Sequence, residues 1–289
     1  MEQKHEVLRI WAESLYDHQD VRLRSHNRVR NLIRRKLLDL GFKPEKKKKK
    51  EEDVPEGSEW DDKKLIKLLK EAEKKKLLSE ADHSFLTKSL ELAQNEHQVE
   101  KDYEKELRPL IEAEPIWMEW LQYVNGISTR NTTRLLKHFG YCERFDTISK
   151  LWAYSGLKVQ DGHAVMRKKG ELLGYNLKIK TAMVGVIGDC LIKSNKSYKK
   201  RIYDTYKKRI QARGCCEKKH SKHKGKMCKD YPGHSARMAQ RKMVKIFLAH
   251  YWLKCRELKG LETRGPYAVD KMKHTTNIKP FYDKQPDKQ

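Results

Sequence analysis

The chain of 289 residues carries 65 Lys and Arg against 40 Asp and Glu, a formal net charge of +25 that predicts a polyanionic partner, nucleic acid above all. The longest apolar run, residues 182–188, is too short to span a bilayer, and residues 1–6 do not lead into the apolar stretch of a signal peptide. We therefore expect no membrane partner, a cytoplasmic, nucleoid-associated location and reduced cysteines.

Residues 1–115 are predicted to form an N-terminal helical arm. Apolar residues recur at helical spacing over residues 2–40, and the stripe turns polar at His18, Arg22 and His26. Helices of this kind pack as a hairpin or as a coiled coil, so the arm could also join two copies in a homo-oligomer.

The rest of the arm follows a charged linker. Residues 43–60 hold a run of lysines and are predicted to be exposed, and residues 61–78 predict a second helix. A capping box at residues 79–82 opens a third helix, which Pro109 and Pro115 should terminate.

Residues 116–259 have the composition of a compact domain, with more glycine, aromatic and β-branched residues than the arm. The spacing of apolar residues predicts helices over 177–191, 198–210 and 235–258. Strands are expected near residues 158–167, and residues 260–289 read as an extended tail. The predicted fold class is mainly α, an arm followed by a compact helical domain that contains a helix-hairpin-helix.

The predicted helix-hairpin-helix turns at Gly126. A glycine turn of this kind lets the next helix point its free N–H groups at a phosphate. The residues predicted to contact phosphate here are Gly126, Ser128, Thr129, Arg130 and, one helical stretch further on, Lys137. Ser128 stands where the motif usually has a second glycine, and a simple structural turn is the alternative.

Two other basic segments are candidates for nucleic-acid contact. The loop at residues 162–170 contributes Arg167, Lys168 and Lys169, and Asn176 lies just beyond it. The helix at 198–210 contributes Lys199, Lys200, Arg201, Lys207 and Lys208, interleaved with tyrosines. Such tyrosines either stack on unpaired bases or face the core, and the cations reach phosphate in both cases.

Residues 213–234 combine an irregular composition with six metal-ligand side chains. These side chains are Cys215, Cys216, His220, His223, Cys228 and His234. Four such ligands make a tetrahedral zinc site, and a loop without hydrophobic residues needs something to hold it. A structural zinc ion is therefore the predicted cofactor, with a basic loop that carries incidental Cys and His as the alternative.

The order of motifs adds a resemblance to a known family. Phe139-Gly140 and Phe145 follow the glycine turn, residues 151–157 read Leu-Trp-Ala-Tyr-Ser-Gly-Leu, and a basic loop and a helix come next. In this order the chain resembles the C-terminal part of the insertion-sequence 110 family of transposases, DEDD recombinases that use a structured guide RNA. The resemblance spans about residues 13–258 and implies contact with DNA and with structured RNA.

Two departures from the family limit what the resemblance implies. The family begins with a RuvC-like nuclease domain, whereas the resemblance starts near the first residues of this sequence. The family also carries a catalytic serine after the segment that matches residues 151–157, where this chain has Asp161. A carboxylate cannot replace a hydroxyl as the nucleophile that forms a reversible link to DNA. Ser155 comes too early, on a segment expected to be packed.

The sequence therefore favours a nucleic-acid-binding protein derived from an insertion-sequence transposase, without strand cleavage by this chain alone. One alternative is an active transposase or recombinase subunit that is completed by a RuvC-like domain in trans. The other alternative is a structural dimer that coats DNA through its basic domain.

Overall fold

The structure is a computed structural model that describes residues 2–39, 70, 72–160, 163–165, 170, 172, 174–213, 232–263 and 278–284. These residues are mainly helical, which confirms the predicted fold class. The chain divides into two compact units, one of residues 9–107 and one of residues 108–289 together with 1–8.

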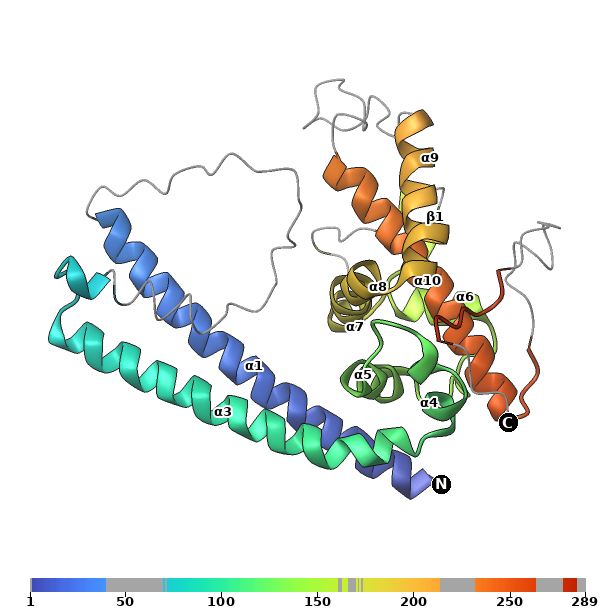
Figure 1. The fold of residues 1–289 in the computed structure, drawn as a ribbon, viewed down its shortest axis with the longest axis horizontal. Helices are drawn as coiled ribbons and strands as arrows, with labels where there is room; N and C mark the ends of the chain where they lie inside the picture. The colour runs from blue at the N-terminus through green and yellow to red at the C-terminus, as the bar shows by residue number, and fades with distance from the viewer. Residues whose placement is uncertain are drawn as a thin grey trace. The chain divides into compact units, whose positions relative to one another are not determined.

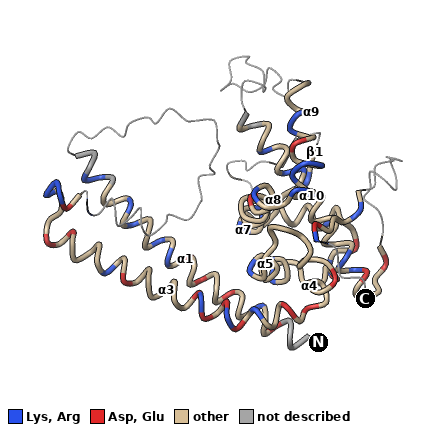
Figure 2. Tube along the Cα trace, viewed as in Figure 1, with Lys and Arg blue, Asp and Glu red and all other residues tan. Residues whose placement is uncertain are grey.

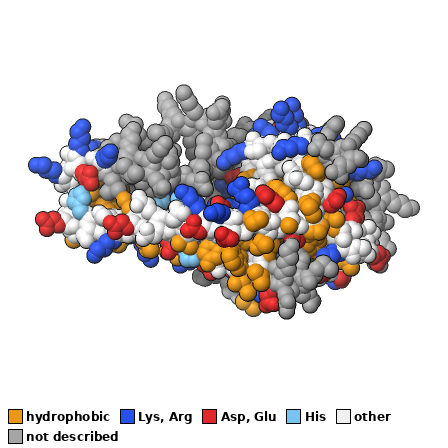
Figure 3. Space-filling model, turned by 60° about the horizontal axis from the view of Figure 1, so that its bottom comes forward, with side chains coloured by type: hydrophobic (Ala, Val, Ile, Leu, Met, Phe, Trp, Pro, Cys, Tyr) orange, Lys and Arg blue, Asp and Glu red, His pale blue; other side chains and the backbone are white. Residues whose placement is uncertain are grey.

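The first unit is built from two long helices. α1 (Glu2–Asp39) and α3 (Glu80–Glu112) run antiparallel and side by side (Figure 1). Val29 and Ile33 of α1 pack with Leu86 of α3 in a buried cluster, because apolar residues at helical spacing give each helix one apolar face. Lys, Arg, Asp and Glu side chains are interspersed along the outside of the pair in Figure 3.

The polar interruption of the α1 stripe has a structural reason. Arg22 forms a buried ion pair with Glu100 of α3, with Nε 2.5 Å from the carboxylate, and His18 lies 2.6 Å from Glu96. Charges removed from water need a partner, and each helix supplies the partner that the other lacks. The pairs also fix the register of the two helices, since a one-turn slip would separate them.

The predicted capping box before α3 is confirmed. Ser79 Oγ accepts from the N–H of Asp82, and the Asp82 carboxylate accepts from the N–H of Ser79 at 2.9 Å. Together with Lys36, these bonds lower the pKa of Asp82 to about 2, the Lys36 hydrogen bond being the largest cause. The predicted end of the helix is wrong: α3 runs to Glu112 with Pro109 inside it, and Ile111 beyond the proline is fully buried.

The second unit surrounds one long helix with short ones. In chain order its elements are α4 (Pro115–Glu119), the 3-10 turn η1 (Leu121–Tyr123), α5 (Thr129–Phe139), α6 (Ile148–Tyr154), β1 (Val159–Gln160), β2 (His163–Ala164), α7 (Leu177–Thr181), the π-helical segment η2 (Ala182–Ile187), α8 (Gly188–Ser194), the π-helical segment η3 (Tyr198–Asp204), α9 (Thr205–Arg213) and α10 (Pro232–Leu258). β1 and β2 pair antiparallel with Val159 opposite Ala164, where strands were expected.

α10 is the centre of this unit. It contacts η3, α9, α6, α8, η2 and α4, and Val244, Phe247, Leu248 and Tyr251 on one side of it are fully buried. Their spacing of three and four residues is the one that the sequence predicts for a buried helix.

The helices predicted at 177–191 and 198–210 each contain a π-helical segment, η2 and η3 respectively. The segment from 177 to 194 is helical throughout, but η2 within it is π-helical. Gln240 of α10 donates a hydrogen bond to the carbonyl of Val184 in η2, at 2.9 Å. A side chain that inserts into the regular i→i−4 hydrogen bonds of a helix and bonds to one of their carbonyls is a recognised cause of such a distortion.

The predicted helix-hairpin-helix is not confirmed. Before Gly126 the chain has the five-residue α4 and a single 3-10 turn, and only the element after the turn, α5, is a regular helix of several turns. Most of the helix predicted at 61–78 and the linker at 43–60 lie outside the described residues.

Removing the Glu100 carboxylate should destabilise the arm strongly. Glu100→Ala leaves Arg22 buried without its partner, and we expect the free energy of unfolding to fall by about 3–5 kcal/mol. Thermal and urea unfolding followed by circular dichroism measure the change.

The matched control is the exposed pair Arg9–Glu13 on α1, whose side chains are 59% and 51% exposed. Glu13→Ala should cost no more than about 1 kcal/mol. Equal losses for the two variants would contradict the role given to the buried pair.

Candidate nucleic-acid interface

A group of crowded cations lies along the first half of α10. Desolvation, followed by the charges of Lys242 and Arg241, lowers the pKa of Lys245 to about 8. Desolvation and then the charge of Arg209 from α9 lower the pKa of Lys242. Burial is the larger cause in both cases, and neighbouring like charges that stand close together add to it. At neutral pH Lys245 remains mostly protonated.

Two partly buried aromatic rings adjoin these cations. The Trp152 Nε1–H of α6 donates to the carbonyl of Lys245 at 3.0 Å, and the Lys245 ammonium lies 4.1 Å from the centre of the Trp152 ring. Lys180 of α7 covers the Tyr175 ring in the same way, with its ammonium 4.7 Å from the ring centre. A cation over an aromatic face is attracted by the ring quadrupole, so each ring holds its lysine in place.

Chain segments far apart in sequence meet at this surface. Arg241 donates a hydrogen bond to the carbonyl of Lys158, just before β1, at 3.0 Å. Positions of Lys and Arg gather where α9, α10 and β1 come together in Figure 2. We call this surface the α10 face, and its residues are Trp152, Lys158, Tyr175, Lys180, Arg209, Arg241, Lys242 and Lys245. None of its cations forms an ion pair with a carboxylate among the described residues.

The segment 151–157 packs against residues of the α10 face. Ser155 is fully buried and donates to the carbonyl of Leu151 at 2.8 Å, so its hydroxyl has a packing role, as expected from its position. Gly156 has a φ of +66°, and a Cβ there would lie 2.6 Å from the Tyr175 ring. Glycine is thus required for Tyr175 to lie against the backbone.

The Gly126 turn is packed against the second unit's own helix. Gly126 has a φ of +89°, and a Cβ there would lie 2.6 Å from the carbonyl oxygen of Cys190 in α8. Ser128 is the N-cap of α5 and accepts from the N–H of Asn131, while the carbonyl of Thr129 accepts from the Thr133 hydroxyl. Close packing and helix capping therefore account for the glycine and for the serine.

A described stretch of the tail, residues 278–284, also occupies the turn, and we call it the strap. The Asp283 carboxylate accepts from the N–H of Asn125 at 3.0 Å and from the side-chain amide of Asn195. The Trp120 Nε1–H donates to the carbonyl of Phe281 at 3.0 Å. One N–H group next to the glycine is thus already bonded to an anion of the chain itself.

His250 joins the strap to the core. Its ring lies 2.6 Å from the Tyr198 hydroxyl and 2.7 Å from the carbonyl of Ile278. A carbonyl only accepts, so Nε2 carries the proton and Nδ1 accepts from Tyr198. Burial lowers the pKa of His250 to about 4, which keeps this ring neutral near pH 7 and assigns it a structural role.

The predicted basic helix places its cations outward. Tyr198 and Tyr203 are buried, which favours the core-facing alternative for these tyrosines. Lys199, Lys200, Arg201 and Lys208 are exposed and Lys207 is half-buried over the Tyr203 ring. These cations form a second basic group on η3 and α9, next to the Arg209 end of the α10 face.

The other predicted contact residues are scattered or fall outside the described part of the chain. Asn176 caps α7 by accepting from the N–H of Ile179, and Arg130 and Lys137 lie half-buried on α5. The loop residues Arg167, Lys168 and Lys169, together with Asp161, lie outside the described residues.

The predicted zinc site cannot be placed in the structure. The residues Cys215, Cys216, His220, His223 and Cys228 lie outside the described residues, and of His234 only the backbone, in α10, is described. Within the described part no group of three or more His, Cys, Asp or Glu side chains is arranged to hold a metal ion. None of the helices in that part is long and apolar enough to cross a membrane.

The sequence-based prediction missed the cations of the α10 face. A signal was present, because Arg241 and Lys245 are four residues apart and a helix places them on one face. The proximity of Trp152, Lys180 and Arg209 to that face could not be found in this way, since it depends on how four helices pack.

Comparison with family models, with curated proteins and with solved structures finds no match to this chain.

Substitution of Gly126 separates a packing role from a phosphate-binding role. Gly126→Ala should lower the free energy of unfolding by the strain of a positive φ, about 1–3 kcal/mol, and by a further 1–3 kcal/mol or so for the clash with Cys190. Unfolding in urea measures the loss.

Gly140→Ala is the control, because Gly140 also has a positive φ, +54°, but no atom lies within 4 Å of the added Cβ. It should show the strain alone. If Gly126→Ala were no more destabilising than Gly140→Ala, packing would not be the reason for the glycine.

Proposed function

We propose that this chain binds nucleic acid and that the α10 face is its main phosphate-contacting surface. The observation that carries the proposal is the crowding of Arg209, Arg241, Lys242 and Lys245, none of which pairs with a carboxylate among the described residues. Uncompensated cations repel one another, and a polyanion relieves that repulsion while releasing its own counterions.

The aromatic rings favour nucleic acid over other polyanions. Trp152 and Tyr175 lie among the cations and are only partly buried. Each ring holds a lysine over its face, and the part of the ring that stays exposed is available to the sugars of a nucleic-acid backbone.

A basic membrane-surface helix is the competing explanation for such a charge. That function requires a helix whose apolar side is available to enter the lipid. The apolar side of α10, from Val244 to Tyr251, is instead buried in the core of the second unit. The cations of α10 therefore lack the exposed apolar partner face that a membrane-surface helix needs.

The partner that we propose is DNA, with structured RNA as a second one, as the resemblance to insertion-sequence 110 transposases implies. Phosphate contacts dominate in this proposal, so binding is sensitive to salt and only modestly specific for sequence. The proposal does not include strand cleavage by this chain, because Asp161 stands where the resemblance expects the nucleophilic serine.

Loss of two α10 cations should weaken binding markedly. The double variant Lys242→Gln, Lys245→Gln removes two of the proposed phosphate contacts, and we expect at least about a tenfold loss of affinity for duplex DNA at low salt. The slope of log affinity against log salt should become shallower by about 2. Electrophoretic shift and fluorescence anisotropy series over salt measure both values.

Lys101→Gln, Lys105→Gln on the arm is a control with the same change in net charge and exposed lysines. It should change the affinity less than threefold. The proposal is wrong if the wild-type chain binds none of duplex DNA, a four-way junction, single strands and structured RNA at low salt.

A further inference from the structure

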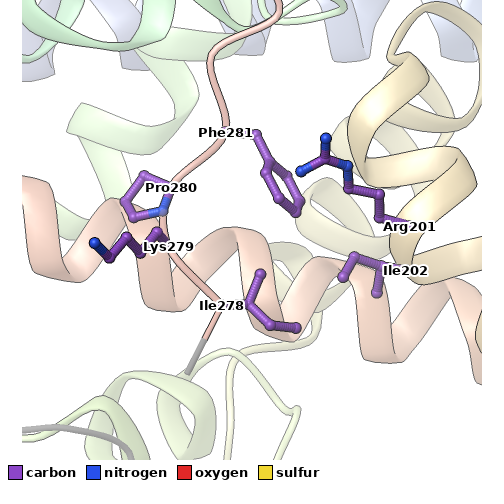
Figure 4. A pocket seen from close by; sticks show the side chains of 6 residues that line it. All are labelled: Arg201, Ile202, Ile278, Lys279, Pro280 and Phe281. Carbon is purple, nitrogen blue, oxygen red and sulfur yellow. The ribbon is translucent and has the colours of Figure 1, made fainter. Parts of the chain in front are cut away.

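A hollow of about 440 Å³ lies between the strap and η3, and none of the residues that line it belongs to the α10 face. It is lined by Arg201 and Ile202 of η3 and by Ile278, Lys279, Pro280 and Phe281 of the strap. Figure 4 shows the Phe281 ring and the Arg201 guanidinium turned toward each other at its edge.

The apolar floor of the hollow is held rigidly. The Phe281 ring meets the Tyr198 ring edge to face at 4.8 Å, and Phe281 itself is fixed through its carbonyl by Trp120. The Ile278 carbonyl accepts from His250, so the strap is anchored at both ends of the hollow. A floor that does not have to be ordered on binding costs little entropy when a ligand arrives.

The guanidinium of Arg201 forms one wall. It lies 5.4 Å from the centre of the Phe281 ring, and its side chain is exposed to solvent. It forms no ion pair with a carboxylate among the described residues. Phe281 thus supports one side of a planar cation, and the other side remains open to solvent.

The neighbouring charges match a nucleic-acid backbone. Lys199 and Lys200 precede Arg201 on η3 and are both exposed, and Lys279 is exposed on the strap. A planar cation backed by an aromatic ring, with exposed lysines beside it, suits a ligand with a flat ring and a phosphate on each side.

We propose that the Arg201 guanidinium, at the edge of this hollow, is a stacking site for one unpaired nucleobase of a single-stranded nucleic acid, while Lys200 and Lys279 beside it hold the adjoining phosphates. The site rests on the proposed function and deepens it, because it assigns single-stranded segments as a ligand distinct from duplex. A base within a duplex is already stacked on both faces and cannot stack on Arg201 as well.

The test is Arg201→Lys, measured against two probes of equal length and charge at low salt. One probe is single-stranded oligodeoxythymidylate, and the other is the same backbone without bases. Lysine keeps the charge but lacks the plane on which a base stacks. We expect about a tenfold loss of affinity for the oligodeoxythymidylate and less than a twofold change for the abasic strand.

The control is Lys208→Gln, which removes an exposed cation of α9 outside the hollow and should weaken both probes equally. The melting temperature of Arg201→Lys should equal that of the wild type, since the side chain is exposed. Equal losses on the two probes would overturn the base site and leave nucleic-acid binding intact. If the wild-type chain bound neither probe and also did not bind duplex DNA, both proposals would be overturned.

Discussion

The burial of one side of α10 is the constraint on which the second unit depends. Val244, Phe247, Leu248 and Tyr251 recur at three and four residues and are all fully buried. An α-helix that buries this stripe must turn its remaining positions outward, and the sequence places its cations at those positions. The same residue spacing therefore builds the core and gathers the charge from which we infer the function.

The N–H and O–H groups of buried Trp and Tyr side chains hold the segments around α10 in place. Trp252 donates to the carbonyl of Phe145 at 2.7 Å, and Tyr251 donates to that of Gly140 at the same distance. Trp120 does the same for the strap. A buried aromatic ring with a satisfied N–H or O–H fixes both its own rotamer and the loop that it reaches. The α10 face and the hollow beside η3 are thus presented by a rigid frame.

Local patterns predicted the long elements and missed what depends on packing. The stripe of α10 and the capping box at Ser79 are readable because each depends on residues a few positions apart. The π-helical segments are not, and the one in η2 accepts a hydrogen bond from Gln240 of another helix. The same holds for the candidate site. Arg201 and its basic neighbours are adjacent in the sequence and could be predicted, whereas Trp152 and Lys245 become neighbours only in the fold. The carboxylate of Asp283 at the glycine turn likewise comes from 158 residues away from Asn125.

We infer that nucleic acid lies on the α10 face. This inference is tested most directly by lysine footprinting, in which the chain is acylated briefly with and without duplex DNA at low salt and the modified lysines are identified by mass spectrometry. We expect DNA to protect Lys180, Lys242 and Lys245 several-fold, while Lys88 and Lys101 of the arm react equally in both samples. Protection confined to the arm, or no protection of the three α10-face lysines under conditions in which DNA is bound, would contradict the inference.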